Sequence, residues 1–108
     1  MFETGLHEDD LWVGEMRGIE LNGCPVLLVR HEQGVAAYRD RCPHQGYPLS
    51  EGELSGGILI CRAHHHHFDA VTGEGINPLR PCLTRLKLST AAGRIAVDPG
   101  PRTRKAEP

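Results

Sequence analysis

Two short segments each combine one cysteine with one histidine, and their spacing constrains this chain more than any other feature. The first is Cys42-x-His44 and the second is Cys61-x-x-His64, with 16 residues between His44 and Cys61. Thiolate is a soft donor and neutral imidazole a borderline one, and both bind transition metals. Five of the seven histidines lie between positions 44 and 67. We therefore expect a metal site with two sulfur and two nitrogen ligands.

Structural zinc is the alternative, because two cysteines and two histidines also satisfy tetrahedral Zn²⁺. Zinc fingers usually take two cysteines from one knuckle and two histidines from a helix, whereas each segment here supplies one of each. This arrangement favours an iron–sulfur cluster whose two irons have different ligands. Cys24 and Cys82 lie outside both segments, in apolar runs. We expect them to be inert, buried thiols.

Charge and hydropathy exclude several classes of function. The net charge is -2, with acidic and basic residues interspersed, so no basic face for nucleic acid is expected. The longest apolar stretch, Pro25 to Val29, is too short to cross a membrane. Glu3, Glu8 and Asp9 occupy the N-terminus, where a secretory signal would carry positive charge. These features favour a soluble, cytoplasmic protein whose cysteines are reduced.

Short apolar or alternating runs separated by turn residues predict an all-β fold, since no long segment repeats at the helical period. Asn22-Gly23 predicts a tight hairpin flanked by Leu21 and Val26, because both turn residues tolerate positive φ. Trp12 is expected to be a packed strand residue. Further turns are expected at Gly56-Gly57, Gly73, Gly75 and Gly93. The expected strands are Leu11–Val13, Glu15–Leu21, Pro25–Arg30, Gly34–Arg39, Gly57–Cys61, His67–Asp69, Cys82–Leu88 and Arg94–Val97.

The two ligand segments match the pattern C-x-H, 15 to 17 residues, C-x-x-H, which is the Rieske signature. The chain resembles the Rieske ferredoxins of multicomponent di-iron monooxygenases for toluene, alkenes and isoprene. Three other segments carry the likeness over positions 10 to 97: Leu11–Met16 (LWVGEM), Pro48–Gly52 (PLSEG) and Gly73–Pro78 (GEGINP).

The resemblance implies an antiparallel β-sandwich with a small cluster-binding subdomain. It implies a domain at residues 1–98, with the subdomain at about 40–82, while the polar, proline-rich segment 99–108 is expected to be a disordered tail. One [2Fe–2S] cluster per chain is expected, with Cys42 and Cys61 on one iron and His44 and His64 on the other. A third loop, Ile76–Pro81, is expected to cover it.

The resemblance also implies a function as an electron carrier with no catalytic residues of its own. A flavin-containing, NADH-dependent reductase would reduce the cluster, and a di-iron hydroxylase would receive the electrons. The expected protein is a monomer that contacts its partners through a small, transient patch. The residues expected in this docking rim are Gln45, Gly46, Tyr47, His65, His66 and Pro78. The alternative is a Rieske subunit of a nitrite reductase or of a ring-hydroxylating dioxygenase system.

Two positions bear on the reduction potential and on docking. High-potential Rieske proteins direct serine and tyrosine hydroxyls at the cluster sulfurs, and the corresponding positions here look like His66 and Phe68. Phe68 has no donor, so a potential at the low end of the Rieske range is expected. His65 and His66 replace an aliphatic and an aromatic residue of related ferredoxins, which makes partner contact sensitive to pH if they lie on the rim.

Overall fold

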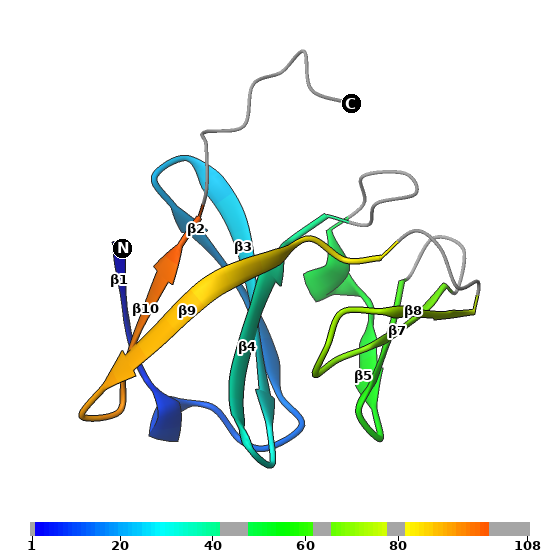
Figure 1. Ribbon diagram of the computed structural model, residues 1–108, viewed down its shortest axis with the longest axis horizontal. Helices are drawn as coiled ribbons and strands as arrows, with labels where there is room; N and C mark the ends of the chain where they lie inside the picture. Colours follow the sequence, from blue (N-terminus) through cyan, green and yellow to red (C-terminus); the bar gives the residue numbers. More distant parts are fainter. Residues whose placement is uncertain (1, 42–47, 62–65, 78–81, 100–108) are drawn as a thin grey trace.

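A computed structural model describes residues 2–41, 48–61, 66–77 and 82–99 of this chain. Within these ranges it contains two antiparallel sheets and two single-turn 3-10 helices, η1 and η2 (Figure 1). The elements are β1 (Phe2–His7), η1 (Glu8–Asp10), β2 (Met16–Leu21), β3 (Cys24–His31), β4 (Gly34–Arg39), η2 (Leu49–Glu51), β5 (Glu53–Ser55), β6 (Ile58–Ile60), β7 (His67–Asp69), β8 (Gly75–Asn77), β9 (Arg85–Ala91) and β10 (Arg94–Asp98).

The larger sheet has the strand order β1-β10-β9-β4-β3-β2 and forms the body of the fold. The smaller sheet, β5-β6-β7-β8, is inserted between β4 and β9 and lies beside the body in Figure 1. The all-β prediction is thus confirmed, and the inserted sheet corresponds to the small subdomain that the resemblance implied.

Strand β3 lies between two hydrophobic layers, which explains why four consecutive residues in it are fully buried. Side chains alternate between the two faces of a strand. Leu27 and Val29 pack in a cluster with residues of the small sheet, including Leu59 and Phe68. Val26 and Leu28 belong to a second cluster that includes Ile95 and Val97 from β10. Strand β3 therefore has one face toward the small sheet and the other toward the cluster that contains residues of β9 and β10.

The predicted hairpin at Asn22-Gly23 is confirmed in its turn and corrected in its flank. Asn22 and Gly23 have φ values of 50° and 76°, as a type I′ turn requires. The residues that flank the turn are Leu21 and Cys24, whereas Val26 pairs with Ile19 further along the ladder. A two-residue turn joins Leu21 directly to Cys24, so Val26 is too far along the chain to flank the turn.

Other strand predictions differ in their outcome. The predicted bounds of β4 and β7 agree with the structure. Strands β1, β5 and β8 were not predicted, because β1 is largely polar and the other two have only three residues each. Of the predicted turn glycines, Gly56, Gly57, Gly73 and Gly93 have positive φ, but Gly75 begins β8. The strand predicted from Cys82 begins at Arg85.

The predicted strand at Leu11–Val13 is wrong, and so is the packed position of Trp12. Leu11 follows η1, and the Trp12 side chain is 82% exposed. The backbone N–H of Trp12 donates to the Glu15 carboxylate at 2.9 Å, and the Glu15 N–H donates back to the Trp12 carbonyl at 2.8 Å. These bonds close a turn, so the alternation expected of a strand does not apply here.

The C-terminal segment that we expected to be a tail is described only at its first residue. Pro99 is buried, and residues 100–108 lie outside the described part of the chain. None of the helices in the described ranges has the length and apolar character that crossing a membrane would need.

Candidate metal centre

Cys61 is the one predicted ligand that the structure describes; Cys42, His44 and His64 lie outside the described residues. Cys61 directly follows β6, and its side chain is a free, fully buried thiol. It packs in the same hydrophobic cluster as Leu59. Among the residues that the structure describes, no group of three potential metal-binding side chains is gathered.

The segment that contains Cys61 and His64 connects two paired strands. Ile60 of β6 pairs with His67 of β7, and the Cys61 N–H donates to the His66 carbonyl at 2.9 Å. These contacts hold together the two ends of the connection, which we call the second ligand loop (residues 61–66). The C-x-x-H segment therefore belongs to a hairpin connection with fixed ends.

The ends of all three expected loops lie close to one another. The Arg39 N–H, just before the first ligand loop (residues 41–48), donates at 2.9 Å to the carbonyl of Thr84, just after the third loop. His67, after the second ligand loop, pairs with Asn77 of β8. In sequence the third loop was expected at Ile76–Pro81, but Ile76 and Asn77 belong to β8, and residues 78–81 lie outside the described part. The fold thus joins the residue after the third loop to the residue before the first ligand loop, and the strand before the third loop to the strand after the second ligand loop.

Of the six residues predicted for the docking rim, only His66 is described, and it is half-buried. Gln45, Gly46, Tyr47, His65 and Pro78 lie outside the described residues. Phe68, the position at which a hydroxyl was expected to be missing, is buried in the cluster that contains Cys61.

The two remaining cysteines differ from each other. Cys24 is buried, as predicted. Cys82 is exposed, so its prediction as a buried thiol is wrong. Its neighbour Leu83 is the residue that enters the core, and β9 begins only at Arg85. The apolar run around Cys82 predicted a strand register that the chain does not adopt.

The small sheet is fastened to the body by a buried tyrosine. The Tyr38 hydroxyl of β4 donates to the carbonyl of Ala70, just after β7, at 2.8 Å. Burial raises the pKa of Tyr38 to about 12, with Asp69 adding to the rise and Arg85 opposing it. Gly73 lies against the ring, and a Cβ added there would be 2.7 Å from Tyr38 Cε1. This contact fixes the sheet that carries Cys61.

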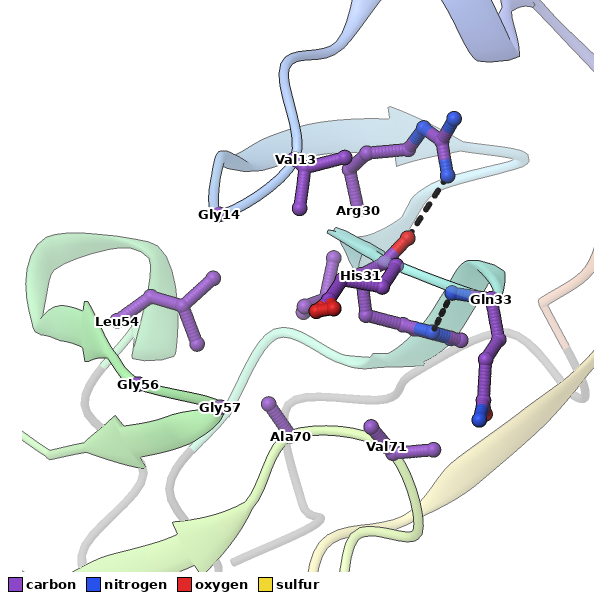
Figure 2. Close-up of a pocket in the computed structure, with 12 residues that line it drawn as sticks. Val13, Gly14, Arg30, His31, Gln33, Leu54, Gly56, Gly57, Ala70 and Val71 are labelled. Atoms are coloured by element: carbon purple, nitrogen blue, oxygen red, sulfur yellow. Dashed lines mark hydrogen bonds between the residues drawn. The ribbon is translucent and has the colours of Figure 1, made fainter.

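A surface cleft of about 530 Å³ lies where other turns meet (Figure 2). It is lined by the β3–β4 turn, the β5–β6 turn and the residues after β7, which are at the opposite strand ends from the ligand loops. His31 in its wall accepts a hydrogen bond from the Gln33 N–H at 3.2 Å. Burial, followed by the charges of Arg30 and Arg85, lowers the pKa of His31. Cys61, the predicted ligand that the structure describes, does not line this cleft.

Comparison with known proteins identifies the family of the chain and agrees with its fold. Residues 4–89 match the family model described as Rieske [2Fe–2S] domain. The ferredoxin component of the alkene monooxygenase system of Xanthobacter autotrophicus is 42% identical over 100 residues, which are 92% of this chain and 82% of that protein.

Two solved structures have the same fold. A chain in the complex of reduced oxygenase and oxidized ferredoxin of carbazole 1,9a-dioxygenase has a TM-score of 0.76 at 27% identity, covering 84% of this chain and 86% of that one. The carbazole 1,9a-dioxygenase ferredoxin of Nocardioides aromaticivorans has a TM-score of 0.77 at 24% identity, covering 87% and 93%.

Proposed function

This chain belongs to the Rieske [2Fe–2S] domain family, and from that premise we propose that it is the ferredoxin component of an oxygenase system. Its role is to carry single electrons from a reductase to an oxygenase, and the oxidation of the organic substrate takes place on the partner. The 42% identity to an alkene monooxygenase ferredoxin, over 82% of that protein, is the observation that carries this proposal.

Four residues would hold the cofactor, a Rieske-type [2Fe–2S] cluster. Cys42 and Cys61 would bind one iron, and His44 and His64 the other. The described part of the donor set fits this role, because Cys61 is a free thiol at the end of a strand and makes no disulfide. When bound, such a cluster accepts and releases one electron at a potential above that of all-cysteine plant-type clusters.

The residues around Cys61 hold this one described ligand in place and keep water away from it. Cys61 is fully buried beside Leu59 and Phe68, so its side chain lies in a medium of low dielectric. The N–H of Cys61 donates a hydrogen bond to the His66 carbonyl, and this bond holds the two ends of the second ligand loop together. A ligand frame that does not rearrange keeps the reorganisation that accompanies electron transfer small.

The finer assignment concerns the partners. We propose an NADH-dependent flavoprotein reductase as donor and a di-iron hydroxylase as acceptor, both meeting a monomeric chain in the cytoplasm. The relative that supports this assignment is described as part of an alkene monooxygenase system. The expected contact is the docking rim Gln45, Gly46, Tyr47, His65, His66 and Pro78, whose positions fall within the two ligand loops and the third loop.

Reconstitution tests the proposal directly. The purified chain is added to an alkene monooxygenase hydroxylase and a reductase that lack their own ferredoxin, and epoxide formation and NADH consumption are followed together. The proposal predicts product only when the chain is present and at a rate that saturates with its concentration. Product formation that does not depend on the chain, or stable co-purification with the large subunit of a nitrite reductase, would contradict it.

A further inference from the structure

A buried carboxylate lies two residues before the predicted ligand Cys42. Asp40 is 8% exposed and is the one buried charged side chain among the residues that the structure describes. It accepts hydrogen bonds from the backbone N–H of Ser50 at 2.8 Å and from the Ser50 hydroxyl at 2.7 Å. Its own N–H donates to the Pro25 carbonyl of β3 at 3.1 Å. Asp40 is thus anchored to β3 through its backbone, and its carboxylate is bonded twice to Ser50.

These two bonds span the first ligand loop. Asp40 follows β4, and Ser50 lies in η2, so the segment between them includes the predicted ligands Cys42 and His44. The side-chain bridge therefore ties together the two ends of this loop. Hydrogen bonds to a charged acceptor are stronger than those between neutral groups, and burial keeps water from replacing them.

The other end of η2 is pressed against the strand that leads to Cys61. The Gly52 N–H donates to the Leu49 carbonyl at 2.9 Å and ends the turn of helix. A Cβ added to Gly52 would collide with the Ile60 carbonyl oxygen, and Glu53 pairs with Ile60 in the β5–β6 ladder. Since Ile60 precedes Cys61, η2 lies between the residues that lead to the two predicted cysteine ligands.

Strand β2 covers the bridge, and this requires glycine at position 18. A Cβ added to Gly18 would be 2.8 Å from Asp40 Oδ2, 2.8 Å from Ser50 Oγ and 2.9 Å from Ser50 Cβ. Its φ is not positive, so the requirement is one of space. The backbone of β2 therefore packs directly against the bridge.

We propose that the Asp40–Ser50 bridge positions Cys42 relative to Cys61, and that this spacing governs how firmly the cluster is held. The inference rests on the proposed function, because it concerns the same four ligands. Asp40 and Ser50 are positioning residues: they act through the loop ends and η2 and are not themselves ligands.

The test uses the cluster-containing protein and measures the rate at which visible absorption bleaches in a chelator with mild denaturant. Asp40→Ala removes both bonds and should speed the loss about tenfold or more, given the strength of bonds to a charged acceptor. Ser50→Ala removes one bond without changing the net charge, and should give a smaller acceleration. The EPR spectra of both variants should show a broadened or split signal, because the ligand spacing is no longer fixed.

Two controls separate positioning from simple loss of stability. Ser55 is an exposed serine in β5 of the small sheet, and Ser55→Ala should bleach at the wild-type rate. Val97→Ala lowers stability in the second hydrophobic cluster, which does not include Cys61. Compared at equal loss of unfolding free energy, Asp40→Ala should bleach several times faster than Val97→Ala. Equal bleaching rates, with unchanged EPR signals in the Asp40 and Ser50 variants, would overturn the proposal.

Rescue by a conservative variant gives a second, independent test. In Asp40→Asn the amide oxygen can still accept from the Ser50 N–H, and the amide N–H can donate to the Ser50 hydroxyl, so bleaching should return close to the wild-type rate. Gly18→Ala should mimic Asp40→Ala by pushing the bridge apart. If Asn fails to rescue while Gly18→Ala has no effect, the bridge does not position the ligands. A wild-type protein without iron and sulfide would instead refute the proposed function, which keeps the two failures distinct.

Discussion

Replacing Tyr38 by phenylalanine removes the hydroxyl whose hydrogen bond to Ala70 joins the body to the small sheet. The ring stays buried, while the Ala70 carbonyl loses the donor that lies 2.8 Å away. An unsatisfied buried acceptor costs about 1–3 kcal/mol. Tyr38→Phe should therefore lower the free energy of unfolding by about that amount at neutral pH.

The pH dependence gives a sharper signature. The Tyr38 pKa rises from 10.0 to about 12 in the folded protein, so between these values the unfolded chain loses this proton and the folded chain keeps it. Stability then falls as the pH rises, by up to about 3 kcal/mol, since one pKa unit corresponds to about 1.4 kcal/mol. Phenylalanine has no such proton, so the wild-type advantage should shrink above pH 10 and approach zero by about pH 12.

Urea unfolding followed by far-ultraviolet circular dichroism is the appropriate assay. Trp12 fluorescence would be a poor reporter, because that side chain is already 82% exposed in the folded protein. Tyr47, the other tyrosine of the chain, is unchanged in the variant, so the difference between wild type and Tyr38→Phe isolates Tyr38. A difference that stays constant from pH 8 to pH 11.5 would refute the reasoning.

Three further predictions concern the ligands and their support. Cys61→Ser should abolish the Rieske visible and EPR spectra, whereas Cys82→Ala should leave both spectra unchanged and alter stability by less than about 0.5 kcal/mol, because Cys82 is exposed. Gly73→Ala should lower the urea midpoint, since a Cβ there would be 2.7 Å from the Tyr38 ring and the φ of +83° disfavours alanine. His64→Ala should destroy the EPR signal and His65→Ala should keep it; the reverse result would show that the ligand register is wrong.

The sequence predicted the fold class because it depends on local patterns. Alternating runs predicted β4 and β7, and Asn22-Gly23, two residues that tolerate a positive φ, predicted a hairpin. Cys61, predicted as the last residue of a strand, directly follows β6. These features are specified by short-range spacing, which a single sequence contains.

Features that depend on turns, strand register or side-chain bonds could not be predicted from alternation in the same way. Trp12 looks like a core residue until the turn closed by Glu15 turns it outward. Cys82 and Leu83 differ in burial only because of the register with which the chain enters β9. The bond between Asp40 and Ser50 joins two elements on either side of a ligand loop, and no local pattern indicates it.

The content of iron, sulfide and zinc in the purified chain tests the central claim most directly. The account predicts about two irons and two acid-labile sulfides per chain, with no stoichiometric zinc and a red-brown colour. Dithionite should reduce the sample and produce the EPR signal of a Rieske centre. A colourless protein with one zinc and no sulfide would contradict the account, because Zn²⁺ has no redox chemistry and could not carry an electron.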